Sequence, residues 1–175
     1  MNSRVCADAN HWPPRHIRIG FSAESQQYFD ERWKEMRKLA AAGWRIYCSA
    51  EPLLGSINAR RALTEGLEQI IVGGESGAGA RPMCIEWVRS LRDQCTAAGA
   101  AFFFKQWGEW ASAGSRRVGE AGRFALVPRE FDGPSAEVRE YPRSFSSFGY
   151  SVMERVGKKK AGRLLDGREW GEFSG

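Results

Sequence analysis

The chain has 175 residues, of which 42% are hydrophobic and 27% are charged, and its formal net charge is +5. These values are ordinary for a soluble globular protein, and the length is enough for one domain with a core. No apolar run is as long as a membrane span, and the start of the chain lacks the apolar core of a signal peptide. Membrane and secreted classes are therefore excluded, and we expect the protein in the cytoplasm of its host cell.

Alternating strands and helices are predicted from residue 16 onward. Residues 1–15 are polar and contain two prolines, so we expect a flexible N-terminal segment there. Short runs of β-branched and aromatic residues then predict four strands, over 16–21, 44–49, 68–73 and 101–106. Helices are predicted between consecutive strands, over 26–42, 57–66 and 85–98.

Two of the predicted helices have the residue spacing of an amphipathic helix. The first has an apolar face and ends before Gly43, a natural C-terminal cap. Its face consists of Phe29, Trp33, Met36 and Ala40. The last helix has a stripe that we expect to be buried, and it ends at Gly99. That stripe consists of Cys84, Val88, Leu91 and Cys95.

The β-α-β-α-β-α-β order over 16–110 predicts an α/β fold with a parallel sheet and right-handed crossovers. Residues 111–175 are predicted to form an irregular extension with a basic tail that packs on these βα units. Within this extension, 124–127 resembles a strand, and an Asp-Gly pair predicts a hairpin between Arg163 and Trp170.

The cysteines form no C-x-x-C pair, and none has a histidine nearby at metal-ligand spacing. They are Cys6, Cys48, Cys84 and Cys95. We therefore interpret them as buried residues or free thiols, and no metal site is predicted.

A polar residue stands at the carboxyl end of each predicted strand, where the functional groups of parallel α/β folds gather. This set, the polar rim, consists of Glu24, Glu51, Glu75, Lys105 and Gln106. One interpretation is that the polar rim binds a polar ligand such as a sugar ring or an amine. The other is that its members pair with one another and with loop amides, closing the end of the sheet. No catalytic residue is predicted.

The loop over 73–81 is rich in glycine and predicts a candidate anion site. Its backbone N–H groups and the guanidinium of Arg81 are the donors that an anion needs. The expected site residues are Gly74, Ser76, Gly77 and Arg81. The loop matches neither the phosphate-binding Walker pattern nor a dinucleotide fingerprint, and a tight structural turn is the alternative.

A second basic feature lies near the C-terminus. This basic tail consists of Arg155, Lys158, Lys159, Lys160 and Arg163. It predicts either phosphate contacts with a nucleic acid or a tail that is only solvated. The aromatic run 102–104 is more typical of a strand buried on both faces than of a surface that stacks bases.

Several phrases of the sequence closely resemble the C-terminal half of a phage and prophage protein family of unknown function. They are GFSAESQ (20–26), SAEPLLG (49–55), IVGGESG (71–77), ARPM (80–83), WVRSLRDQC (87–95), FFFKQWGEW (102–110) and GRLLDGREW (162–170). Longer members of that family look like radical S-adenosylmethionine proteins. Their N-terminal half carries a cysteine cluster suited to an iron–sulfur site.

The resemblance implies a half or partial TIM-type barrel that keeps the polar rim and lacks the cysteine-rich half. The four cysteines cannot supply the family's three-cysteine motif, so we expect no cofactor. S-adenosylmethionine is a possible ligand only through the resemblance. Half a barrel exposes two sheet edges and its inner face, and such edges invite pairing. We therefore expect a homodimer or docking onto a host or phage protein.

Three functions follow from these expectations. The first is a non-catalytic binding protein, such as a phage inhibitor of a host defence protein. The second is a subunit or remnant of a radical S-adenosylmethionine-type enzyme. The third is a nucleic-acid-binding protein that uses the basic tail.

Overall fold

The computed structural model describes residues 12–113, 123–129 and 149–173. The first stretch contains β1 (Arg18–Ser22), α1 (Gln26–Ala41), β2 (Arg45–Ala50), α2 (Arg60–Thr64), β3 (Leu67–Gly73), α3 (Ile85–Ala98), β4 (Ala101–Gln106) and β5 (Trp110–Ser112). The other two contain β6 (Phe124–Pro128), β7 (Tyr150–Arg155) and α4 (Lys158–Ala161). No helix within these ranges is long and apolar enough to cross a membrane.

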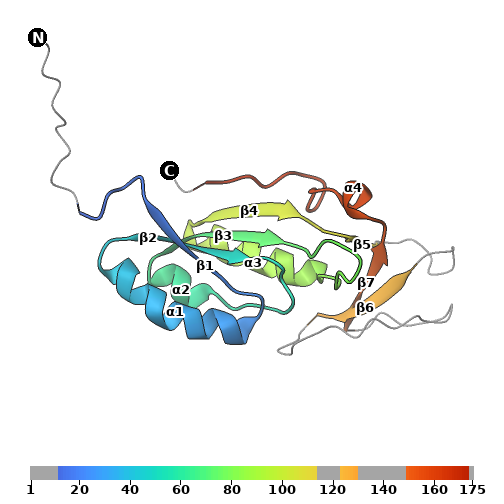
Figure 1. Ribbon diagram of the computed structural model, residues 1–175, viewed down its shortest axis with the longest axis horizontal. Helices are drawn as coiled ribbons and strands as arrows, with labels where there is room; N and C mark the ends of the chain where they lie inside the picture. Colours follow the sequence, from blue (N-terminus) through green and yellow to red (C-terminus); the bar gives the residue numbers. More distant parts are fainter. Residues whose placement is uncertain (1–11, 114–122, 130–148, 174–175) are drawn as a thin grey trace, which may run out of the picture.

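The four strands β1 to β4 form one parallel sheet in their order along the chain (Figure 1). A helix connects each strand to the next, as parallel neighbours require. Each predicted strand and helix of this region is present, with ends that differ by at most three residues from the expected ones. The mixed α/β class with a parallel sheet is therefore confirmed.

The ends of the two long helices follow from local sequence. Phe29 and Trp33, the buried residues of α1, come from the predicted apolar face. After the last residue of α1, the chain reverses at Gly43, where φ is +88°. Helix α3 ends at Gly99, whose φ of +68° is the left-handed conformation typical of a helix cap.

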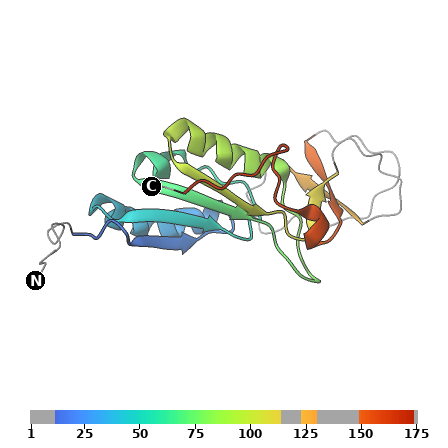
Figure 2. The same cartoon turned by 90° about the horizontal axis from the view of Figure 1, so that it is seen from above.

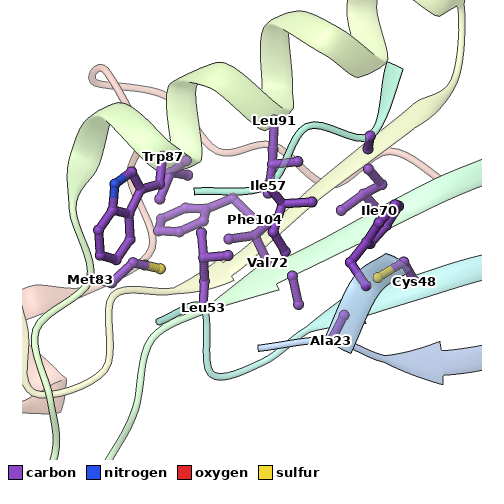
Figure 3. Close-up of a cluster of buried hydrophobic side chains, with 14 of the residues drawn as sticks. Ala23, Cys48, Leu53, Ile57, Ile70, Val72, Met83, Trp87, Leu91 and Phe104 are labelled. Carbon is purple, nitrogen blue, oxygen red and sulfur yellow. The ribbon is translucent and has the colours of Figure 1, made fainter. Parts of the chain in front are cut away.

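The core lies between the helices and one face of the parallel sheet. One registered row crosses all four strands and is buried throughout: Phe21, Cys48, Ile70 and Phe102. Figure 3 shows Trp87 and Leu91 of α3 directed at Val72 and Phe104 of the sheet. The predicted stripe of α3 is fully buried, so this helix fixes the position of β3 and β4.

The other face of the sheet, the open face, has no helix on it in the described part of the chain. Its middle row pairs Ser22, Ser49, Ile71 and Phe103 in register. These side chains are partly or fully exposed. Phe103 was expected to be buried on both faces, but it is only half-buried, with the exposed Phe173 ring 5.1 Å away.

The region predicted to be irregular contains a second, antiparallel sheet in the order β5-β7-β6. The expected strand over 124–127 is β6. This sheet lies beyond the carboxyl ends of β3 and β4 (Figures 1 and 2). It is attached to α3, because the Trp87 indole N–H donates to the carbonyl of Arg129 and the Ser151 hydroxyl donates to Glu86. The rest of the predicted extension, and residues 1–11 of the N-terminal segment, lie outside the described residues.

The C-terminal segment covers the outer edge of β4. The predicted Asp-Gly turn is present, because the backbones of Leu165 and Arg168 exchange hydrogen bonds around it. The expected hairpin does not continue, and its second arm instead lies antiparallel to β4. Phe104 donates its N–H to Trp170, and Glu172 donates its N–H to Phe102. A bridge to β4 satisfies more backbone groups than a short isolated hairpin does.

Candidate functional site

The polar rim assembles where expected, at the carboxyl ends of the parallel strands. Each of its three carboxylates faces a cation from its own chain. Glu24 lies 3.2 Å from Arg32, and Glu51 lies 3.0 Å from Lys105.

The pair on the open face is held by a third polar group. The Ser49 hydroxyl donates to Glu51 at 2.9 Å, and Glu51 accepts from Lys105 with its other oxygen. The carboxylate lies over Gly73, where a Cβ would stand 2.5 Å from Oε1. Glycine is thus required for Glu51 to lie flat on the sheet. The Lys105 side chain is 57% exposed, so its ammonium also faces solvent.

Glu75 and Arg81 form the most completely bonded pair of the polar rim. Two guanidinium nitrogens and the backbone N–H of Arg81 each donate to the Glu75 carboxylate at 2.8 Å. These bonds hold the pKa of Glu75 below its usual range and raise the pKa of Arg81. The donors that were expected to face an external anion are therefore occupied by a carboxylate of the same loop.

Other members of the candidate anion loop also have internal partners. The N–H of Gly77 donates to the Glu109 carboxylate at 3.2 Å, and Ser76 accepts from Gln106 at 3.4 Å. Gly74 is needed for packing, because a Cβ there would stand 1.9 Å from the carbonyl oxygen of Trp107. These contacts give the loop the geometry of a tight structural turn.

The fold brings the basic tail next to the polar rim. Arg155 donates to the carbonyl of Gly77 at 2.8 Å, and Trp107, just after β4, donates its N–H to Gly162 at 3.1 Å. Figure 2 shows α4 beside the loop that follows β3. Two features that were separate in sequence, the glycine-rich loop and the lysine run, thus share one surface.

The three lysines of α4 are exposed and have no ionic partner within the described residues. Arg163, by contrast, lies 3.1 Å from Glu169, and the Arg155 guanidinium lies 5.9 Å from the centre of the Trp110 ring. The unneutralised charge of the basic tail is therefore concentrated in α4. Such a cluster attracts anionic groups, and salt screens the attraction.

The described cysteines do not suit an iron–sulfur cluster. Burial raises the pKa of Cys84 and of Cys95 to about 12, and it raises the pKa of Cys48 as well. A cluster ligand must be a thiolate. No group of three potential metal ligands occurs among residues 12–113, 123–129 and 149–173. Cys6 lies outside these ranges.

Sequence reasoning missed several partners that complete this region. Arg32 lies on α1, and a helix face gives no sign of which strand end it reaches. Ser49 was detectable, because it stands two residues before Glu51 and therefore on the same side of the strand. Glu109 and Glu169 gave no signal, since each contacts a residue whose position depends on the tertiary fold.

The family model described as "Protein of unknown function (DUF5131)" matches residues 1–174. No curated protein and no solved structure matches the chain. The single match spans nearly the whole length of the chain, both sheets included. The chain therefore belongs to the DUF5131 family of proteins of unknown function.

Proposed function

We propose that this chain is a non-catalytic binding protein, built on a partial TIM-type barrel, that docks through the free edge of β1. The observation that carries the proposal is the difference between the two edges of the parallel sheet. The edge of β4 is covered by the chain's own residues 170–172, whereas β1 pairs only with β2 among the described strands. A free edge is a template for another strand.

A non-catalytic role is supported by the state of the reactive groups in the described part of the chain. The carboxylates of the polar rim are paired with cations, and the thiols are buried with raised pKa values. A general base needs a carboxylate or imidazole free to take a proton, and a nucleophile needs an accessible thiolate or hydroxyl with a base. The described part of the polar rim offers neither arrangement.

The occupant that fits the β1 edge best is a second copy of this chain. Ala23 donates its N–H to Ser49 of β2, so the N–H groups of Gly20 and Ser22 point outward from the sheet. Antiparallel pairing of two β1 strands about Gly20 places Arg18 opposite Ser22, which opposes no like charges. The exposed Ile17, just before β1, would be covered in such a dimer.

Light scattering coupled to size exclusion tests this proposal. The unaltered chain is expected to be a dimer. Ser22→Pro removes an outward N–H without touching the β1–β2 ladder, and it should give a folded monomer. Ser22→Ala keeps the N–H and should remain dimeric. A monomeric unaltered chain, or a dimeric Ser22→Pro variant, would contradict pairing through β1.

A narrower form of the proposal gives the chain a phage origin and a role in the host cytoplasm as an inhibitor of a defence protein. In that form the host protein takes the place of the second copy at β1. The phage-like phrases of the sequence support it. Its distinguishing result is a monomeric chain that forms a one-to-one complex with the purified defence protein and that loses this complex in Ser22→Pro.

A second candidate function is a subunit of a radical S-adenosylmethionine-type enzyme, with another chain supplying the cysteine cluster. The observation that favours it is the Glu51–Lys105 pair on the open face, where a barrel would bind its ligand. Calorimetry with S-adenosylmethionine tests this candidate. It expects binding heat that Glu51→Gln reduces, with Glu75→Gln as a second variant. No heat with the unaltered chain would exclude unaided binding.

A further inference from the structure

The ring of Tyr47 forms a flat aromatic platform on the open face. A Cβ placed on Gly20 would stand 2.2 Å from Cζ of Tyr47 and 2.5 and 2.6 Å from the two Cε atoms. A point that is nearest to one ring carbon, and almost equally close to both neighbours, lies above the face of the ring. The ring therefore lies flat on the backbone of β1, and its second face is directed away from the sheet.

A guanidinium without a carboxylate partner lies next to this platform. Arg18 stands two residues before Gly20, so it projects from the same face of β1. Its Nη1 donates to the amide oxygen of Gln69 at 3.4 Å, across β2. Gln69 is the registered neighbour of Tyr47, so the guanidinium passes close to the ring. No described carboxylate pairs with it.

The open face is nearly neutral between this platform and the carboxyl ends of the strands. Glu51 and Lys105 lie there, and their charges offset each other. Beyond them, at the end of β4, lie the exposed lysines of α4. Two strand spacings and about five residues of strand rise separate Tyr47 from α4, which is about 20 Å. A ligand that contacts both must be an extended polymer.

We infer that the open face binds single-stranded nucleic acid, with a base stacked on Tyr47 and phosphates held by Arg18 and by the lysines of α4. Exposed aromatic faces and a line of positive charge are the two features by which proteins hold single strands. A duplex does not fit the platform, because its bases are already stacked on one another. The inference goes beyond docking through β1 and does not depend on it.

Fluorescence anisotropy with a labelled oligothymidylate of about 16 nucleotides tests the inference. The single strand should bind more tightly than a duplex of the same length, and its affinity should fall linearly on a log–log plot against salt. Tyr47→Ala should weaken binding about tenfold, whereas Tyr47→Phe should retain it, because the ring is kept.

The charge contribution is tested by a matched pair of double variants. Lys158→Ala/Lys159→Ala should weaken binding and reduce the salt slope by about 1–2, because each lost phosphate contact removes nearly one from the slope. Lys34→Ala/Arg37→Ala removes the same charge from the exposed side of α1 and should leave both affinity and slope unchanged.

Three results would overturn the inference. They are no binding at low salt, equal affinity for single strand and duplex, and a Tyr47→Phe variant as weak as Tyr47→Ala. Equal binding of polyglutamate, insensitive to Tyr47→Ala, would assign the lysines to an acidic polymer instead. The monomer expected from Ser22→Pro should still bind the oligonucleotide, which separates this inference from docking through β1. Circular dichroism of each variant checks that it is folded.

Discussion

The ring of Tyr47 occupies the space that a side chain at position 20 would need, so Gly20 and Tyr47 form one structural unit across β1 and β2. Glycine is otherwise unfavourable in a strand. Its presence in the middle of β1 is explained by the close approach of the ring.

Gly20→Ala is therefore expected to lower the free energy of unfolding by about 1 kcal/mol, the lower end of overpacking effects, because Tyr47 can turn toward solvent. Urea denaturation measures the change. In a Tyr47→Ala background the same substitution should be neutral or slightly stabilising, since the clash is gone. Gly79→Ala, at a position with nothing within 4 Å of a Cβ, is the matched control. Equal effects of Gly20→Ala in both backgrounds would disprove the coupling.

The attachment of the C-terminal segment is expected to depend on pH through Asp166. Hydrogen bonds from Arg89, and then from Arg92, hold the pKa of this carboxyl below its usual range. A lowered folded-state pKa stabilises the folded form above the ordinary value of about 3.9 and loses this contribution as the pH falls through the lowered value. Acid should therefore loosen the segment, and the fluorescence of Trp170 should report it.

Asp166→Asn isolates this carboxyl from the other acidic groups. Residue 166 has a φ of +53°, a left-handed conformation that asparagine also adopts, so the turn is preserved. The variant should be less stable at neutral pH and should show a flatter acid limb. Asp30→Asn on α1, where the carboxylate accepts from Gln26, should keep the full acid limb. A wild-type acid limb in Asp166→Asn would assign the pH dependence to other carboxyls.

The parallel sheet and its helices were predictable because their signals are local. The spacing of Phe29 and Trp33 defines a helix face within two turns, and Gly99 marks a helix end by its own conformational freedom. The polar rim was predictable for a related reason. Strand order and direction follow from the βα alternation, and they place every strand's carboxyl end at one edge.

The contacts that determine how this region behaves were not predictable from such signals. The pairing of Phe104 with Trp170, and of β5 with β7, joins segments separated by long stretches of sequence. No periodicity in either partner identifies the other. The sequence likewise shows that Glu75 and Arg81 are charged, but their mutual bonds depend on the fold of the loop between them.

The described cysteines are expected to resist alkylation while the protein is folded. Burial raises the pKa of Cys84 to about 12, and its thiol donates to the Glu86 carboxylate at 3.0 Å. A thiol with such a pKa is almost entirely protonated near pH 8, and only the thiolate reacts. In a Cys6→Ser background, iodoacetamide followed by mass spectrometry should label these cysteines only when urea is added. Rapid labelling of Cys84 without urea would contradict the packing of α3 against β7.

The edge of β4 is expected to open when Glu172 can no longer bond to it. The backbone N–H of Glu172 donates to the carbonyl of Phe102 at 3.3 Å, and its carboxylate accepts from the N–H of Phe102 at 3.2 Å. Glu172→Pro removes both bonds. It should lower the free energy of unfolding by about 1–2 kcal/mol, at about 1 kcal/mol for each bond.

Hydrogen exchange gives the sharper measurement, because local opening can be detected without global unfolding. In Glu172→Pro the amides of Phe102 and Phe104 should exchange faster, while that of Ile70, inside the sheet, should keep its protection. Glu172→Gln retains the backbone donor and a side-chain acceptor, so it should exchange like the unaltered chain. An uncovered β4 edge should also promote association at high concentration. Unchanged exchange at Phe102 in the proline variant would show that Trp170 and the turn before it hold the segment without Glu172.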